Sequence, residues 1–317
     1  MHSRERDVYY WQERTFLKNV NEEWKEHVLF KIIDKDSVEG VGTATPDVYS
    51  GHTFKSTMAI LEELRDFIEN VPEIENLQTV ENLIDRLVGN ENTAKTSIML
   101  AICDYISNKY NIDISKLLFS FEEDKYQENL FRIFWNKDAN ILDVYNEYFT
   151  NDKVVKIEFL EKPSMGDLEK ISSAFQDKRV WLDFRGLLDF YELTKALDLM
   201  RNVEIVALEQ PLAKGREKRI ELIKSQYPVF WDESIVTVED LLGLQKISDG
   251  VVLNVTKVGG LYNVKKIHDL ADVFNLITVI SSGIEHPLNI EWSNKIKAPF
   301  DIVDLYFDHY IVEEHDD

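Results

Sequence analysis

Three acidic side chains stand at regular intervals in the second half of the chain, each at the end of a short apolar run. They are Asp183, Glu209 and Asp232, and they lie 26 and 23 residues apart. If the runs are neighbouring parallel strands, about 4.8 Å apart, the three carboxylates meet on one side of a barrel mouth. Three carboxylates this close do not all stay ionised without a cation. Oxygen ligands without histidine or cysteine favour Mg²⁺ or Mn²⁺, so the spacing predicts a metal site.

Each acid also has a simpler interpretation, as the N-cap of the helix that follows its strand. Aspartate caps helices routinely, whereas Glu209 would be a poor cap. The same arrangement in three consecutive units favours the metal site over three separate caps.

The elements that position these acids are a series of apolar runs from about residue 130 onward. Successive runs start 22 to 26 residues apart, and each interval holds an amphipathic helical stretch. Eight evenly spaced units without a Gly-rich first turn favour a β/α barrel over a doubly wound sheet. In such barrels the catalytic groups sit at the carboxyl ends of the strands. The runs begin near Leu130, Val154, Arg179, Glu204, Pro228, Gly250, Leu276 and Ile302.

The first third of the chain follows a different, α+β pattern. Strands are predicted over His27–Asp34 and Val38–Ala44, and a polar loop follows them at Thr45–His52. Helical spacing comes next, over Lys55–Asn70, Val80–Val88 and Thr93–Tyr110. We therefore expect an α/β protein with an α+β domain at 1–120, a barrel at 121–310 and an acidic tail at 311–317.

Composition narrows the classes of partner. The chain has 317 residues and a net charge of −22, which argues against nucleic acid or an anionic membrane because those surfaces attract basic stripes. The single cysteine, Cys103, excludes a disulfide framework and fits a reducing cytosol. No stretch approaches 18 uncharged apolar residues, so no membrane span is expected. We expect a cytoplasmic protein that takes a small molecule; a homo-oligomer is compatible with the sequence.

Several segments of the barrel resemble the enolase superfamily, and most of all its muconate-lactonizing-type subgroup. The resemblance covers nearly the whole chain, with the α+β part in the place of that superfamily's capping domain and Tyr49-Ser50-Gly51 in its substrate-covering loop. It implies a modified (β/α)8-type, TIM-like barrel. The segments are Asp183–Gly186, Leu208–Pro211, Trp231–Ser234 and Thr256–Leu261, and Val279–Glu285 is most similar to o-succinylbenzoate synthase.

The resemblance also implies a reaction. In this superfamily Mg²⁺ stabilises the enediolate that forms when the proton α to a carboxylate is removed. By resemblance Asp183, Glu209 and Asp232 are the metal ligands, and Glu233 orients them. The implied activity is a lyase, an o-succinylbenzoate synthase-like dehydration of a small carboxylate substrate, as in menaquinone biosynthesis.

The proton-transfer residues depart from the subgroup's pattern. The subgroup uses two lysines, the second of a Lys-x-Lys on strand two and one on strand six. Here the first motif reads Lys156-Ile157-Glu158, and the strand-six position holds Asn254. A general acid–base group is worth roughly 10²–10⁴-fold in rate, so the usual reaction needs a substitute. Lys156 and Glu158 share strand parity, so Lys156 either reaches the site or neutralises an acid; Glu158 is a candidate base or extra ligand, and Asn254 a hydrogen-bond donor.

Other residues at the rim are candidates for catalysis or substrate binding. His286 follows strand seven and titrates near neutrality, but it precedes Pro287 at a helix start, where capping is common. Gly259 and Gly260 expose backbone N–H groups to an anion, or serve a tight turn. The remaining candidate substrate contacts are Ser50, Ser281 and Ser282.

Three functions remain open from the sequence. The first is the metal-dependent lyase. The second is a superfamily member that has lost proton transfer and binds a metal or ligand. The third is an acid-sugar dehydratase or racemase that uses His286 as its base.

Overall fold

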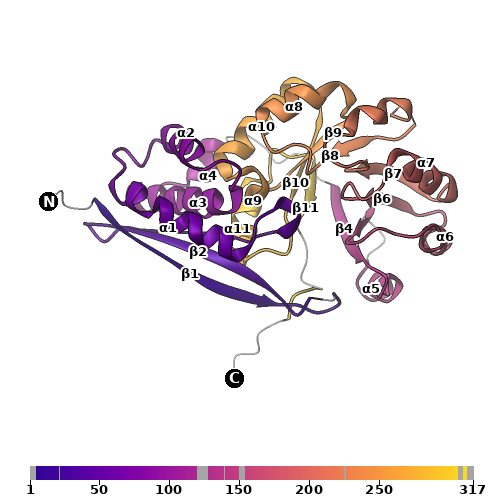
Figure 1. Ribbon diagram of the computed structural model, residues 1–317, viewed down its shortest axis with the longest axis horizontal. Helices are drawn as coiled ribbons and strands as arrows, with labels where there is room; N and C mark the ends of the chain where they lie inside the picture. Colours follow the sequence, from indigo (N-terminus) through magenta and orange to yellow (C-terminus); the bar gives the residue numbers. More distant parts are fainter. Residues whose placement is uncertain are drawn as a thin grey trace.

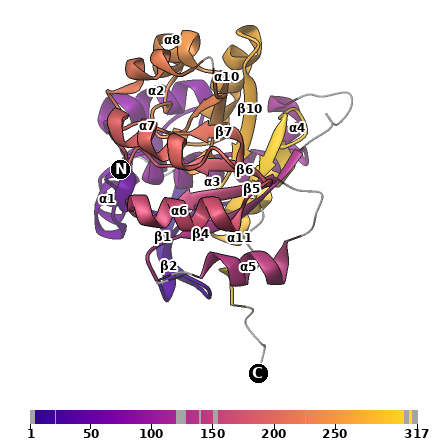
Figure 2. The ribbon, with the colours of Figure 1, turned by 90° about the vertical axis from the view of Figure 1, so that its right-hand side faces the viewer.

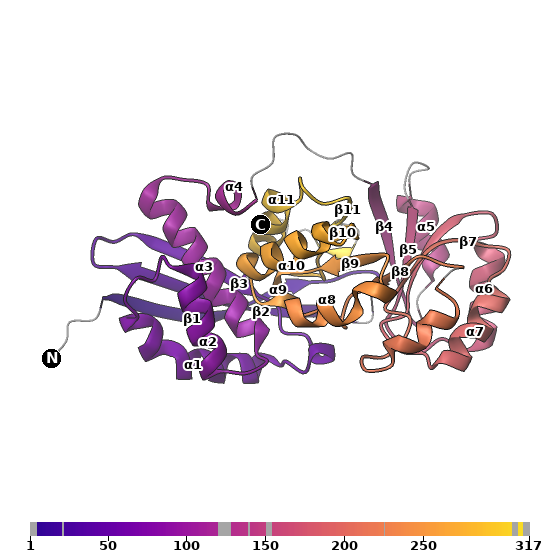
Figure 3. The same cartoon turned by 90° about the horizontal axis from the view of Figure 1, so that it is seen from above.

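The computed structural model describes residues 5–20, 22–119, 128–138, 140–149, 154–224, 226–305 and 310–312. An α+β domain lies beside a β/α barrel, and Figures 1 and 3 show the two as neighbouring units. The expected acidic tail falls outside the described residues except for positions 311 and 312. No helix in the described part of the chain has the length and apolar character to cross a bilayer.

Eight parallel strands close the barrel in the order β10-β11-β4-β5-β6-β7-β8-β9, and β9 pairs with β10. Each strand begins within two residues of its expected position, so the predicted fold class is confirmed. The strands are β4 (Glu128–Trp135), β5 (Val154–Phe159), β6 (Arg179–Asp183), β7 (Glu204–Glu209), β8 (Val229–Trp231), β9 (Gly250–Leu253), β10 (Ile277–Ser281) and β11 (Ile302–Asp304).

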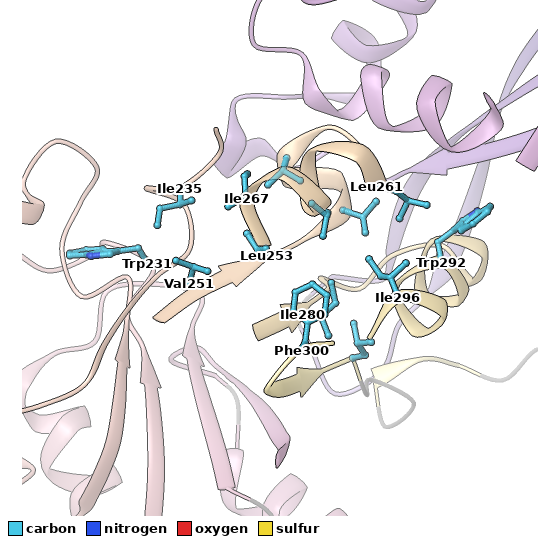
Figure 4. Packing of buried hydrophobic residues seen from close by; sticks show 14 of the residues in the cluster. Trp231, Ile235, Val251, Leu253, Leu261, Ile267, Ile280, Trp292, Ile296 and Phe300 are labelled. Carbon is cyan, nitrogen blue, oxygen red and sulfur yellow. The ribbon is translucent and has the colours of Figure 1, made fainter. Parts of the chain in front are cut away.

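Helices cover the outside of the barrel, and Figure 2 shows α6 and α7 in front of their strands. Their apolar faces pack against outward-pointing strand residues, as Leu261 and Ile267 do beside Leu253 in Figure 4. The helices are α5 (Ile141–Tyr148), α6 (Met165–Ala174), α7 (Phe190–Leu199), α8 (Val238–Leu244), α9 (Val255–Val258), α10 (Leu261–Val273) and α11 (Pro287–Ile296).

Two units depart from the expected one helix per interval. Between β7 and β8 the described residues form a 3₁₀ helix, η2 (Glu217–Leu222), and no α-helix, and Pro211 and the positive φ of Gly215 interrupt helical backbone before it. Between β9 and β10 there are two helices, α9 and α10, separated by a pair of glycines. A further 3₁₀ turn, η3 (Gln245–Ile247), follows α8.

The barrel interior has an apolar layer with one side chain from every strand. Side chains alternate along a strand, so the position two residues later points the same way, one layer nearer the mouth. Every position in that second layer is polar or charged, and it forms a ring that we call the polar ring. The apolar layer is Leu130, Val154, Trp181, Ala207, Phe230, Val252, Val279 and Ile302. The polar ring is Arg132, Lys156, Asp183, Glu209, Asp232, Asn254, Ser281 and Asp304.

The α+β domain holds a three-stranded antiparallel sheet in the order β1-β2-β3. Its helix α3 packs on this sheet at very short range, because a Cβ on Gly40 or Gly42 would lie 2.2 or 2.1 Å from a backbone oxygen of α3. The other side of α3 contacts α9 of the barrel, where Thr96 Oγ1 donates to Val255 O at 3.2 Å. The elements are β1 (Arg6–Phe16), β2 (Trp24–Asp34), β3 (Glu39–Ala44), η1 (Val48–Ser50), α1 (Phe54–Asn70), α2 (Leu77–Leu87), α3 (Asn92–Tyr110) and α4 (Ile114–Leu118).

Candidate active site

A cavity of about 570 Å³ opens above the polar ring, at the carboxyl ends of the barrel strands. One wall comes from the loop that follows β3 in the α+β domain. Ser50, an expected substrate contact, lines the cavity with its hydroxyl 3.4 Å from Asp47 Oδ2, and the covering role of this loop stays a prediction. The loop residues on the cavity are Thr45, Pro46, Asp47, Val48, Ser50 and His52.

Lys156 lies within the polar ring and is 1% exposed. Its Nζ contacts three carboxylates, at 2.7 Å from Glu209 Oε1, 3.0 Å from Asp304 Oδ2 and 3.2 Å from Asp183 Oδ2. Burial and Arg132 lower the pKa of Lys156, but the three acids outweigh them, so its pKa is raised and the ammonium stays charged. Of the two roles expected for Lys156, the geometry supports charge neutralisation.

Arg132 supplies the second buried cation of the ring. Its Nε donates to Asp304 Oδ1 at 3.1 Å, its Nη2 contacts Asp304 Oδ2, and its Nη1 donates to Glu158 Oε2 at 3.0 Å. The same guanidinium donates to Ser281 Oγ at 2.7 Å and to Ser282 O at 3.1 Å. Both serines line the cavity, and each accepts a hydrogen bond that holds Arg132 in place. The hydroxyl of Ser282 has no hydrogen-bond partner among the described residues.

Glu158 lies one layer nearer the mouth, between two arginines. Its carboxylate is 3.0 Å from Arg132 Nη1 and 3.3 Å from Arg185 Nη1. Burial raises the pKa of Glu158, and the two arginines oppose that shift. Arg185 also contacts Glu233 at 3.6 Å and Asp47 at 3.7 Å, so it links Glu158 to the loop that covers the cavity.

The three predicted metal ligands lie in the polar ring, and Asp183 is in register with Glu209 across β6 and β7. Among the described residues, no three acidic, histidine or cysteine side chains are already arranged to hold a metal. Lys156 lies beside Asp183 and Glu209, and Lys257 Nζ lies 2.5 Å from Asp232 Oδ1. Burial first, and then Asp183, raise the pKa of Glu209 well above its usual range.

The donor chemistry of the ring nevertheless fits a hard divalent cation. All candidate ligands are carboxylate oxygens, which Mg²⁺ and Mn²⁺ prefer. The ring contains two cations and four acids, an excess of two negative charges when all are ionised. Lys257 pairs with Asp232 from outside the ring and offsets part of this excess, and an added divalent cation would offset the rest.

Two further candidates are held in structural roles. Asn254 is the N-cap of α9, where its Oδ1 accepts the N–H of Lys257 at 2.8 Å. His286 caps α11 through Nδ1, which accepts the N–H of Leu288 at 3.2 Å, and its Nε2 lies 3.0 Å from Glu13 on β1. Both ring nitrogens of His286 are therefore occupied, and the geometry gives no support to the expectation that this histidine is a base.

Gly259 and Gly260 were expected at the rim but lie outside the cavity lining, against α3. Both have positive φ, 90° and 117°, which side-chain-bearing residues adopt rarely. A Cβ on Gly259 would lie 3.0 Å from Lys95 Cδ, and one on Gly260 3.0 Å from Met99 Cβ. Backbone conformation and close approach of α3 explain these glycines, rather than anion binding.

A buried polar cluster stands beside the cavity at the ends of β9 and β10. Glu285 lines the cavity and is 3% exposed; its Oε1 accepts a hydrogen bond from Thr256 Oγ1 and another from Asn289 Nδ2 at 3.2 Å. Glu285 Oε2 is buried with no hydrogen-bond partner among the described residues. Burial raises the pKa of Glu285 to about 7, against hydrogen bonds from Thr256 and Asn254 that lower it.

This raised pKa makes folding depend on pH. Because the folded chain favours the neutral carboxyl, its stability contribution is fully present below the ordinary pKa of 4.5 and is lost as the pH rises through about 7. The stability of Glu285→Gln relative to wild type should therefore rise by about 3 kcal/mol between pH 4.5 and pH 7, then level off. Urea denaturation at several pH values measures this, with Glu291→Gln on the following helix α11 as the control; parallel curves would contradict it.

Sequence reasoning missed Arg132, Arg185, Asp304 and Glu285 as site residues. Asp304 ends β11 as Asp183 ends β6, so the strand-end rule finds it when applied to the eighth strand. Arg132 is a lone charge inside an apolar run, which is the sequence signal for a buried ion pair. Arg185 comes two residues after the ring residue Asp183, just as Glu158 comes two residues after the ring residue Lys156. Glu285 carried no signal apart from the segment that resembles o-succinylbenzoate synthase.

Two proteins of known activity are similar in sequence to most of the chain. The o-succinylbenzoate synthase of Geobacillus stearothermophilus is 25% identical over 260 residues, which cover 78% of this chain and 67% of that protein. The L-Ala-D/L-Glu epimerase of Bacteroides thetaiotaomicron is 21% identical over 281 residues, covering 86% of this chain and 71% of that protein.

Solved structures show the same fold. The dipeptide epimerase of Enterococcus faecalis V583 aligns with a TM-score of 0.84 at 18% identity, over 98% of this chain and 92% of that chain. A structure of the same epimerase complexed with Mg and the dipeptide L-Leu-L-Tyr aligns with a TM-score of 0.78 at 18% identity, over 95% and 89% of the two chains.

The family model described as enolase C-terminal domain-like matches residues 150–312, about half of the chain and nearly the whole barrel. The α+β domain beside a closed eight-stranded barrel agrees with that match. The chain therefore belongs to the enolase superfamily.

Proposed function

We propose that the chain is a divalent-metal-dependent enzyme that removes the proton next to a carboxylate of a small organic acid. The observation that carries the proposal is the polar ring of four acids and two cations, which lies beneath a cavity of about 570 Å³ at the carboxyl ends of the strands and lines it with Asp183 and Asp232. A ring with this excess of oxygen ligands and negative charge favours a hard cation. The o-succinylbenzoate synthase and the L-Ala-D/L-Glu epimerase described above align with 78% and 86% of the chain.

Asp183, Glu209 and Asp232 would hold Mg²⁺ or Mn²⁺. When bound, the ion would stabilise negative charge that develops on the substrate carboxylate. Trp181 Nε1 donates to Glu209 Oε2 at 2.6 Å, and Lys257 Nζ donates to Asp232 Oδ1 at 2.5 Å, so these neighbours orient the carboxylates. Arg132 and Lys156 remain as fixed counterions that hold the ring together.

The substrate belongs to one of two kinds suggested by the relatives: the precursor that is dehydrated to o-succinylbenzoate, or a dipeptide. The sequence resemblance favours the first, as an o-succinylbenzoate synthase-like lyase, and the structural neighbours favour the second. Both reactions begin by removing a proton from carbon beside a carboxyl or carbonyl group, so one experiment covers their shared step.

The experiment measures exchange of that proton for deuterium. The protein is incubated in D₂O with Mg²⁺ and either L-Ala-L-Glu or L-Leu-L-Tyr, and exchange at the α carbon is followed by NMR; dehydration to o-succinylbenzoate is assayed separately. Mg²⁺ binding is measured by calorimetry. Glu209→Gln should lose at least about 10²-fold in either activity together with Mg²⁺ affinity. No Mg²⁺ binding by the wild type would overturn the proposal.

A second candidate function, a metal- or ligand-binding protein without turnover, is favoured by one specific observation. The two positions where the resemblance expects lysines hold side chains with structural partners, Glu158 between two arginines and Asn254 at a helix N-cap. Mg²⁺ binding without exchange or dehydration for any of these compounds would favour this function over the enzyme.

A further inference from the structure

The buried cluster around Glu285 contains a carboxyl group that neither holds the proposed metal nor pairs with a buried cation. Glu285 follows β10 and lines the cavity. Its Oε1 is held by Thr256 and Asn289, and Asn289 also donates to Thr256 Oγ1 at 2.7 Å. Thr256 and Asn289 are themselves 8% and 0% exposed, so the carboxyl is fixed in one orientation by side chains that cannot move freely.

The other oxygen, Oε2, has no hydrogen-bond partner among the residues that the structure describes. Burying an unpaired carboxyl oxygen costs free energy, and native proteins tolerate few such atoms. Glu285 is 3% exposed and lies on the wall of the cavity, with one oxygen oriented by hydrogen bonds and the other buried without one, so its carboxyl group stands beside the space that a bound molecule would fill.

The two other candidate bases that the sequence offered are less available for proton transfer, and one of them, His286, is not part of the cavity lining. Glu158 would have to leave Arg132 and Arg185 before it accepted a proton. His286 is occupied by Glu13 and by the backbone of α11. We propose that Glu285 is the acid–base residue of this cavity, whose Oε2 accepts the proton from the carbon beside the substrate carboxylate. This inference rests on the proposed function.

The proton transfer balances without any further reactant. The C–H bond of the substrate breaks and its electron pair stays with the substrate, which becomes an enediolate. The proton forms an O–H bond with Glu285 Oε2, so the carboxylate becomes a neutral acid. The same proton, or one exchanged with water, then returns to the carbon or to a leaving group, and Glu285 is again a carboxylate.

Charges that face Glu285 from the surrounding elements keep it suited to this role. Arg132 on β4 lowers its pKa, and Asp47 in the covering loop raises it. Together with burial, which has the largest effect, they leave the pKa at about 7. A general base works best when its pKa lies near the working pH, and a pKa of about 7 meets that condition near neutrality.

The test compares the wild type with Glu285→Gln, Glu285→Asp and the control Glu291→Gln. The amide of Glu285→Gln keeps the size of the side chain and its contact with Thr256 but cannot accept the proton. The rate of α-proton exchange for L-Ala-L-Glu and L-Leu-L-Tyr in D₂O with Mg²⁺ and the rate of dehydration to o-succinylbenzoate are measured between pH 5 and pH 9, with Mg²⁺ affinity and melting temperature recorded for each variant.

We expect Glu285→Gln to lose about 10²–10⁴-fold in rate, with Mg²⁺ affinity within about two-fold of wild type. The wild-type rate should rise with pH up to about 7, and this rise should be absent from the residual rate of Glu285→Gln. Glu285→Asp should keep part of the wild-type rate, and the control Glu291→Gln should match the wild-type rate.

The outcomes separate the inference from the proposed function. A wild-type protein that catalyses exchange or dehydration while Glu285→Gln does so at a similar rate overturns the inference alone. A loss of rate that comes with an equal loss of Mg²⁺ affinity, or that leaves the pH profile unchanged, assigns Glu285 a structural role and also overturns it. A wild type with neither activity overturns the inference together with the enzymatic proposal.

Discussion

The free energy of unfolding of an Arg132→Met variant is expected to be about 3–5 kcal/mol lower than that of the wild type, because the substitution leaves buried carboxylates without their counterion. Arg132 is 4% exposed and holds Asp304 with two contacts and Glu158 with a third. Asp304 keeps Lys156 at 3.0 Å, which limits the loss. Methionine preserves most of the side-chain volume, so the change is mainly one of charge.

Urea denaturation at two pH values gives a specific signature for this loss. In the wild type, burial raises the pKa of Asp304, but Arg132 and Lys156 lower it by more, so the pKa lies below its ordinary value of 3.8. The ion pairs of Asp304 therefore stabilise the fold above that pH. Without Arg132 the pKa of Asp304 should rise, so the deficit should be smaller at pH 5 than at pH 8. Arg179→Met, at a side chain 53% exposed, is the control and should unfold like the wild type. An equal deficit at both pH values would contradict the electrostatic explanation.

A Glu158→Lys variant is expected to be destabilised still more, by at least about 5 kcal/mol, and so to fold marginally or not at all. The substitution removes the carboxylate between Arg132 and Arg185 and places a third cation there, with Lys156 two positions earlier on the same side of the strand. Adding lysines at Glu158 and Asn254 therefore does not restore the subgroup's proton-transfer pair, because the arginines around position 158 are matched to an acid.

Thermal unfolding followed by circular dichroism measures this effect. Glu158→Gln keeps an acceptor for the arginines and should fall between wild type and Glu158→Lys in melting temperature. Glu161→Lys, near the surface on the same segment, should melt like the wild type. If Glu158→Lys melted at the wild-type temperature, the buried charge balance described for the polar ring would be wrong.

The architecture followed from the sequence because its signal is repeated. Eight apolar runs at nearly constant spacing specify eight strands, and local errors of one or two residues in any of them do not change the pattern. β1 was missed because most of its side chains are exposed, such as Tyr9 at 51%, so no alternation of apolar and polar residues marks it. The 3₁₀ segment before β8 was missed because the spacing of strands does not specify what joins them.

The site was predictable only where chemistry coincides with strand ends. Asp183, Glu209 and Asp232 were found because each closes a strand, and the structure places all three in one ring. The ion pairs of that ring were not predictable, because Arg132 and Asp304 are 172 residues apart and meet only when the barrel closes. Strand parity correctly placed Lys156 and Glu158 on one side of β5, but parity does not say which neighbours a side chain meets.

The position of α3 has a consequence for how molecules enter the barrel. This helix is wedged between the sheet of the α+β domain and α9, with glycines on both sides that leave no space for sliding. Asn92 Nδ2 also donates across that boundary to Lys257 O at 2.7 Å. A rigid swing of one domain away from the other would break these contacts together. We therefore expect traffic into and out of the barrel to depend on the short segment at residues 45–52, which an ion pair of Asp47 with Arg185 links to the opposite wall.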